Sequence, residues 1–153
     1  MKLEIRRKGY FNRSYGFVDI NERCLYEVTF QFINWRSSLA RIVDMSTGQE
    51  VIRIHTGMWN YLIDILGYEQ FRITVMPKIY NRDFFLEGKD LDVKFHREGA
   101  FRFRYFIVRK DNRIVAQLNG FTELIIYDYS QFLTAIGITT VLLIIEQSIR
   151  TSA

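Results

Sequence analysis

The sequence FLTAIGITTVLLII at positions 132–145 decides how this chain folds. It is the centre of a run from Tyr129 to Ile145 that has no charged residue, and the next charges are Glu146 and Arg150. Many of its residues are β-branched, which favours a strand, but the run is longer than a usual strand. We therefore predict a helix that is apolar nearly all round. Such a helix lies either in a protein core or in a bilayer.

The length and flanks of this run favour the protein core. A membrane-spanning helix needs about 20 predominantly apolar residues, whereas this run is shorter and contains three threonines. Membrane anchors also tend to have Lys or Arg beside the apolar segment, but the nearest basic residue before the run is Arg113. Tyr127 and Tyr129 are the residue type found at membrane interfaces. The alternative, with residues 130–147 in the bilayer, therefore stays open.

The rest of the chain has the composition of one strand-rich domain. Its 153 residues are 48% hydrophobic and include a single proline, and no linker or low-complexity tract divides them. We therefore expect one domain over residues 1–153. Aromatic residues reach 16%, which favours strands. Short apolar runs separated by turn residues are typical of a sandwich or barrel, and the runs are 15–19, 23–33, 38–45, 49–56, 71–75, 84–87, 101–108, 114–118 and 122–127.

One further segment has helical spacing. Between Met58 and Leu66, apolar side chains fall at Trp59, Leu62, Ile63 and Leu66, and Gly67 follows where a helix C-cap glycine would lie. We therefore predict a short amphipathic helix over residues 58–66.

Three motifs resemble those of LURP-one-related proteins, which share a superfamily with the tubby C-terminal domain and the phospholipid scramblases. The motifs are FFLEG at 84–88, YFIVRKDNRIVA at 105–116 and LARIVDMSTGQEV at 39–51, followed by the apolar C-terminal segment that ends at Glu146. The resemblance covers about Gly16 to Glu146. It implies a mainly β fold, a closed antiparallel barrel of about twelve strands around a central C-terminal helix.

One basic stretch is a candidate binding surface. Strand alternation places Arg102 and Arg104 on one face of the 101–105 segment and its aromatic residues on the other. Arg109, Lys110 and Arg113 follow at the end of that strand and its turn. We predict that these five residues contact lipid phosphates or a partner. The simpler interpretation is a barrel strand whose arginines are only solvated.

The sequence shows no catalytic or metal-binding constellation. His55 and His96 each lack a second ligand at metal spacing, and Asp90 and Asp92 are more typical of a solvated turn. We expect no catalytic residue, no metal and no cofactor. Cys24 is the only cysteine, so no intrachain disulfide forms. The N-terminus lacks the apolar stretch of a signal peptide, and we expect a cytoplasmic location, with membrane association left open.

These observations give two functional hypotheses. The first is a non-enzymatic cytoplasmic barrel that binds anionic lipid headgroups or a protein partner. The tubby-type resemblance implies phosphoinositide binding, and the net charge of +4 favours anionic surfaces over neutral ones. The alternative is a membrane-anchored or scramblase-like protein with residues 130–147 in the bilayer. Nucleic acid is a less favoured partner, and nothing in the sequence predicts the oligomeric state.

Overall fold

The computed structural model describes residues 1–153 except 9–13, 35–36, 78–81, 100–101 and 152–153. Within this part of the chain, twelve strands are followed by a 3-10 turn, η1 (Tyr129–Gln131), and one helix, α1 (Phe132–Thr151). The strands are β1 (Lys2–Lys8), β2 (Ser14–Val18), β3 (Cys24–Asn34), β4 (Ser37–Asp44), β5 (Gln49–Thr56), β6 (Asn60–Ile65), β7 (Glu69–Pro77), β8 (Arg82–Glu87), β9 (Leu91–Arg97), β10 (Phe103–Arg109), β11 (Ile114–Asn119) and β12 (Glu123–Ile126).

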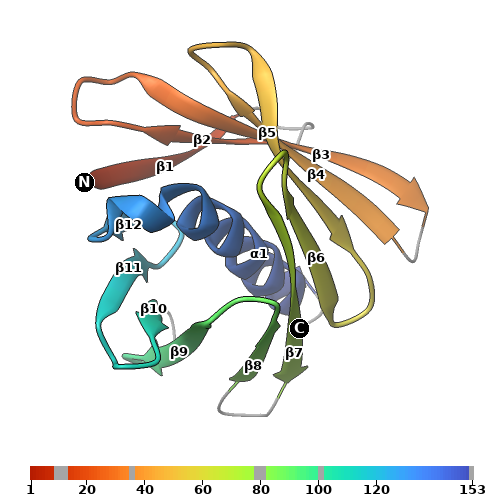
Figure 1. Ribbon diagram of the computed structural model, residues 1–153, viewed down its shortest axis with the longest axis vertical. Helices are drawn as coiled ribbons and strands as arrows, with labels where there is room; N and C mark the ends of the chain where they lie inside the picture. Colours follow the sequence, from red (N-terminus) through yellow and green to blue (C-terminus); the bar gives the residue numbers. More distant parts are fainter. Residues whose placement is uncertain (9–13, 35–36, 78–81, 100–101, 152–153) are drawn as a thin grey trace.

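The strands form one antiparallel sheet that curls into a nearly closed barrel (Figure 1). Almost every strand pairs with its neighbour in sequence, and β1 also pairs with β12, with Leu3 opposite Leu124. The sheet order therefore runs from β8 back to β1 and then from β12 to β9. This confirms the predicted mainly β fold around a C-terminal helix. The barrel is not fully closed, because β8 and β9 are the two edges of the sheet.

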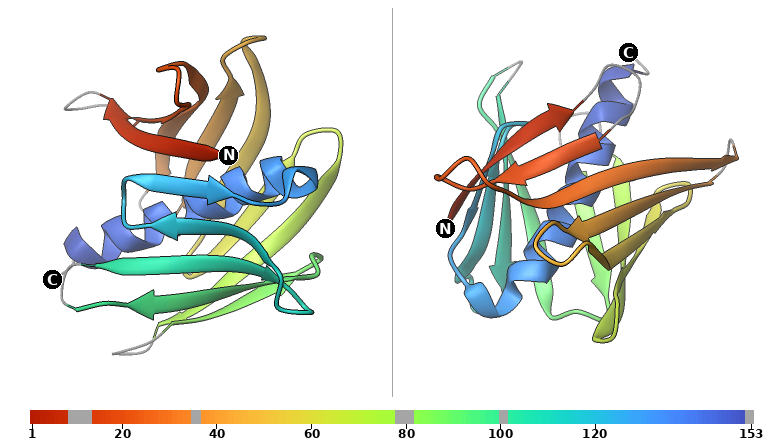
Figure 2. Two further views of the ribbon diagram at one scale, coloured as in Figure 1. Left: turned by 90° about the vertical axis from the view of Figure 1, so that its left-hand side faces the viewer. Right: turned by 90° about the horizontal axis from the view of Figure 1, so that it is seen from above.

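Helix α1 runs through the centre of the barrel (Figure 2). All residues from Thr134 to Leu143 are buried, as expected of a helix that is apolar all round. The inner face of the barrel supplies the matching surface, because inward-pointing side chains such as Leu3, Phe17 and Ile52 are fully buried. The uncharged run is therefore a core helix in this structure.

Gly137 marks a close approach of α1 to the barrel wall. A Cβ atom at this position would lie 3.1 Å from Cγ2 of Ile63 and 3.7 Å from Cγ2 of Ile52. Glycine lowers helix stability by about 1 kcal/mol relative to alanine, so its position here has a packing reason. The absence of a side chain lets β5 and β6 lie directly against the helix backbone.

The prediction of a helix over residues 58–66 is wrong. This segment is mainly β6, whose inward residues Tyr61, Ile63 and Ile65 alternate with outward ones. Gly57 donates to the Asn60 carbonyl across a two-residue turn that contains Trp59, at a φ of 65°. Bulky residues rarely occupy this region, so Met58 and Trp59 at the two turn positions gave no turn signal, although Gly57 and Asn60 flank them. A short apolar run is ambiguous by periodicity alone, and pairing with β5 and β7 determines the strand.

Most other predicted segments are confirmed. The hairpin around Gly48, which has a φ of 73°, forms as β4 and β5. The strand predicted at 101–108 is β10, with Phe103 and Tyr105 buried and Arg104 exposed, while Phe101 lies outside the described residues. Asp128 caps η1 by accepting from the Ser130 amide. Strands β1 and β9 are additions that the sequence did not predict.

The up-and-down order divides the turns between the two ends of the barrel. Successive strands alternate in direction, so the turns 19–23, 45–48, 66–68, 88–90 and 110–113 lie at the end where α1 begins. We call this the N-end of the barrel and the opposite one, toward which α1 runs, the C-end.

The contact at Gly137 predicts which substitutions the core tolerates. Gly137→Asp should leave the protein unfolded, because a buried unpaired carboxylate costs several kcal/mol, comparable to the stability of a whole domain. Gly137→Ala should be milder, since overpacking of about 1–3 kcal/mol is partly offset by helix propensity. Circular dichroism and urea unfolding measure both effects. Ile20→Asp is the control, because Ile20 is 91% exposed; a folded Gly137→Asp protein would contradict the packing.

Candidate functional site

An open cleft of about 510 Å³ lies at the N-end of the barrel. The start of β7, the β8–β9 turn, the β10–β11 turn and the start of the helical segment contribute its walls. The lining residues are Glu69, Gly88, Lys89, Asp90, Leu91, Arg109, Lys110, Asp111, Arg113 and Gln131. The cleft therefore contains four cationic and three acidic side chains, and their pairing decides what the cleft can bind.

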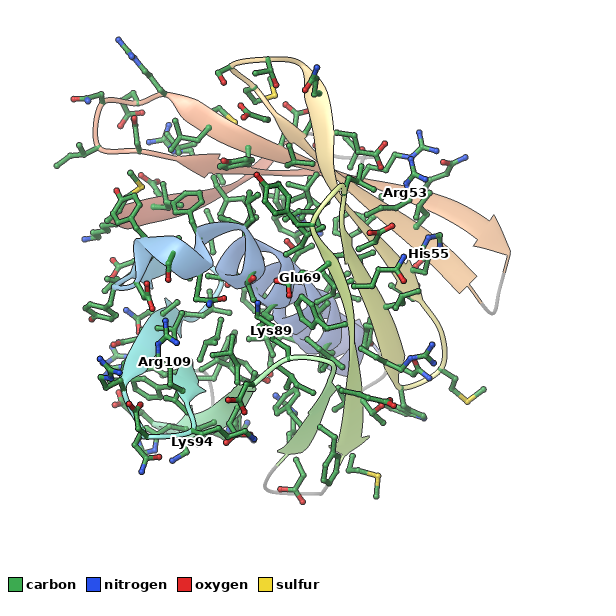
Figure 3. The ribbon with its side chains drawn as sticks, in the orientation of Figure 1. Arg53, His55, Glu69, Lys89, Lys94 and Arg109 are labelled. Carbon is green, nitrogen blue, oxygen red and sulfur yellow. The ribbon has the colours of Figure 1, made fainter. Side chains whose placement is uncertain are left out.

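Two cations on the inner side of the cleft are held by half-buried ion pairs. Lys89 donates to Glu69 Oε1 at 2.5 Å, and the same oxygen accepts from the Thr134 hydroxyl in the first turn of α1 at 3.4 Å. Figure 3 shows Glu69 and Lys89 side by side. Arg109 pairs with Asp128, the residue that caps η1. Hydrogen bonds from Ser130 and Arg109 lower the pKa of Asp128. These pairs fix the cleft to the start of the helix.

Two cations at the mouth of the cleft have weaker attachments. Lys110 lies 3.1 Å from Asp92, and its side chain is 57% exposed. Arg113 lies 2.8 Å from Asp111, and its side chain is 78% exposed. Hydrogen bonds from the Arg113 backbone and side chain lower the pKa of Asp111. Solvent screens exposed ion pairs, so Asp92 and Asp111 hold the side chains of Lys110 and Arg113 only loosely.

The structure brings together only three of the five predicted binding residues. Arg109, Lys110 and Arg113 line the cleft at the N-end. Arg102 immediately precedes β10 and Arg104 is its second residue, both near the C-end, and Arg104 pairs with Glu98 at 3.4 Å. Since a strand rises by about 3.3 Å per residue, the two groups are roughly 20 Å apart. Arg102 and Arg104 therefore do not line the cleft that Arg109, Lys110 and Arg113 share.

A buried polar cluster near the C-end was not predicted from the sequence. The Tyr105 hydroxyl donates to Glu146 Oε1 at 2.5 Å and accepts from Arg82 Nη1 at 2.7 Å. Arg82 and Glu146 also form an ion pair, with side chains 12% and 5% exposed. We call these three residues the seam triad, because they join α1 to β8 and β10 across the unpaired edge of the barrel. Burial raises the pKa of Tyr105, and Arg82 opposes this effect.

Aromatic side chains surround the seam triad. The Arg82 guanidinium lies 4.7 Å from the centroid of the Phe95 ring on β9, and the Tyr105 ring contacts Phe84 and Phe95. The charged groups are therefore shielded from water and depend on one another. Glu146, at the end of the uncharged run, was the only sequence signal for the seam triad. Nothing in the sequence relates Glu146 to Arg82 or Tyr105.

The remaining candidate residues do not gather into a site. His55 and His96 are both exposed and lie on β5 and β9. Asp92 forms an ion pair with Lys110. Among the described residues, no group of three or more side chains has the arrangement of a metal site. Cys24 is half-buried, and its thiol lies 3.3 Å from the Tyr26 carbonyl oxygen.

One helix in the described part of the chain is long and apolar enough to cross a membrane. This segment, Tyr129–Gln147, is 67% buried inside the protein. A core helix of a soluble protein satisfies the same criteria of length and composition. The length and composition of the segment therefore do not distinguish a core helix from a membrane-spanning helix. In this structure the barrel encloses most of the segment.

No family model, curated protein or solved structure matches this chain. The resemblance to LURP-one-related and tubby-type proteins therefore stays a prediction.

The seam triad predicts a strong energetic coupling between β8 and α1. Arg82→Met should destabilise the protein by about 3–5 kcal/mol, because it leaves the Glu146 carboxylate buried without its cation. The double variant Arg82→Met/Glu146→Leu should regain part of this loss, since an apolar pair of similar volume needs no partner, while the buried Tyr105 hydroxyl loses both of its hydrogen-bond partners. Urea unfolding of the wild type, both single variants and the double variant measures the coupling. Additive losses in the double variant would contradict it.

Proposed function

We propose that this domain acts by binding and that the cleft at the N-end receives the phosphate of an anionic phospholipid headgroup at a membrane surface. The observation that carries the proposal is the position of Lys110 and Arg113, two exposed cations at the mouth of an open cleft beside the start of α1. A phosphate between them would gain charge-assisted hydrogen bonds.

The strengths of the ion pairs support this division of roles. Lys110 and Arg113 can exchange their carboxylate partners for a phosphate, because exposed pairs add little stability. Lys89 and Arg109 are only 14% and 35% exposed, so their pairs shape the cleft. The acidic residue Asp90 also lines the cleft. It opposes an anion there, so we expect moderate affinity that falls with salt.

Exposed apolar side chains at the same end of the barrel support a membrane surface as the source of the phosphate. Ile20 and Tyr68 are 91% and 85% exposed on two turns of the N-end, and Tyr129 is 60% exposed just before α1. Aromatic residues of this type favour membrane interfaces, where a ring can be partly buried while its hydroxyl stays in water. A free anion in solution would make no use of them.

The enclosed helix supports surface binding over the membrane-spanning alternative. For residues 130–147 to enter a bilayer, α1 would have to leave the barrel, and the inner side chains that now contact it would face water. That exposure opposes insertion, because burial of apolar surface is the main driving force of folding. We therefore propose a cytoplasmic domain that reaches the membrane through its N-end rather than a scramblase-like protein.

Vesicle flotation tests this proposal. The wild-type protein should float with vesicles that contain phosphatidylserine and not with vesicles of phosphatidylcholine alone. Lys110→Gln/Arg113→Gln should lower the affinity about tenfold or more, because basic residues near an anionic surface contribute strongly. Asp90→Asn should raise the affinity by removing a repulsive charge.

The variant Arg102→Gln/Arg104→Gln is the matched control, since it removes the same charge at the C-end of the barrel. It should bind as the wild type does. An equal loss in the two double variants would indicate attraction by net charge alone and would contradict a site in the cleft. Equal, negligible binding of the wild type to both vesicles would rule out the lipid surface. Saturable binding of inorganic phosphate in a calorimetric titration, without vesicle binding, would instead identify a free phosphate as the ligand.

A further inference from the structure

The edges of the sheet do not pair with each other, although only residues 88–90 separate them. Every other pair of consecutive strands is joined by a ladder, whereas β8 and β9 are the two ends of the sheet order. Figure 1 shows the two strands diverging from the turn at 88–90. We call this unpaired boundary between β8 and β9 the seam. The seam triad lies on its inner side, where Arg82 reaches from β8 over Phe95 of β9.

The register of the sheet identifies the backbone groups that face the seam. The Val75 amide donates toward β6, to the Trp59 carbonyl. In an antiparallel strand the backbone N–H and C=O groups of successive residues point to opposite sides. The backbone groups of Thr74 therefore bond to β8, and those of its partner Phe85 bond to β7. The N–H and C=O groups of Phe84 and Leu86 therefore point away from β7 into the seam.

The same reasoning applies to the opposite side of the seam. Gly120 donates to the Phe103 carbonyl, so Phe103 and Tyr105 bond toward β11 and Arg104 bonds toward β9. The backbone N–H and C=O groups of Val93 and Phe95 consequently face the seam. No ladder joins them to β8 within the described strands. Backbone groups in this position need water or another chain as a partner.

The outer face of β8 has the properties of a recognition strand. Phe85 is 59% exposed on this edge strand, an arrangement that proteins usually avoid because open edges with apolar side chains recruit other strands. Acidic residues flank it at Asp83 and Glu87. Antiparallel pairing of two copies of β8 centred on Phe85 would place Asp83 opposite Glu87, and like charges in that position are destabilising. The edge therefore disfavours a second copy of this chain.

We infer that the β8 edge binds an extended peptide segment of another protein, which adds a strand to the sheet in the seam. Its main chain pairs with Phe84 and Leu86, an apolar side chain lies beside Phe85, and basic side chains face the acidic residues on either side of it. Its inward side chains are small and polar, because they lie toward Arg82 and Tyr105. Strand addition of this kind takes affinity from main-chain bonds and specificity from alternate side chains.

Amide hydrogen exchange measured by NMR tests this inference residue by residue. The probe is a blocked peptide of sequence Thr-Lys-Thr-Val-Thr-Lys-Thr, whose outward side chains are lysine, valine and lysine. In the free protein, the Phe84 and Leu86 amides should exchange faster than the Phe85 amide, which bonds to β7. The peptide should slow exchange at Phe84 and Leu86 about tenfold or more and leave Phe85 nearly unchanged.

Two controls separate strand addition from other binding. The same peptide with N-methyl groups on its two central threonines cannot complete the ladder and should protect neither amide. Glu87→Lys should weaken the response to the lysine peptide and strengthen the response to one with glutamate in place of lysine. Lys110→Gln/Arg113→Gln should respond as the wild type, so a failure of lipid binding is distinguishable. Protection of Phe84 and Leu86 in the free protein, or no change with the peptide at about 1 mM, would overturn the inference.

Discussion

The structure depends on the burial of one helix that is apolar on every side. No single partner surface could cover such a helix, so the chain surrounds it with a curled sheet. The missing side chain of Gly137 lets β5 and β6 approach the helix backbone. The inner side chains of the barrel need the helix as much as the helix needs them. The barrel and α1 therefore form one core, and neither has a stable apolar surface without the other.

Filling the barrel with a helix also determines where function can lie. The interior is occupied by side chains, so a ligand meets the outside of the barrel, and the N-end cleft and the seam between β8 and β9 are the two places that we propose. The N-end presents a cleft in which half-buried ion pairs hold Lys89 and Arg109 and exposed ion pairs hold Lys110 and Arg113. The seam presents open backbone groups above a buried polar cluster. Arg82 connects this seam to Glu146, so the same contact that anchors the C-terminal part of α1 also keeps the edges of the barrel in place.

Sequence reasoning found the elements whose signals are local. The length of the uncharged run distinguished α1 from a strand, and Gly48 marked the β4–β5 hairpin. It failed at residues 58–66, because Trp59 occupies a turn position that normally requires glycine or asparagine. It grouped Arg102 with Arg113 because they are close in sequence, although β10 separates them. The seam triad could not be predicted from the sequence, since Arg82, Tyr105 and Glu146 come together only when the barrel folds around α1.

Hydrogen exchange of the α1 amides tests the central claim most directly. If the barrel encloses the helix as part of a single core, the amides of residues 135–143 exchange only when the whole protein unfolds. Their exchange free energies should then equal the free energy of unfolding from urea titration and fall equally with denaturant. They should also be unchanged when vesicles are present. Fast exchange of these amides in solution, or protection that arises only with vesicles, would show that the helix is not the core of the barrel.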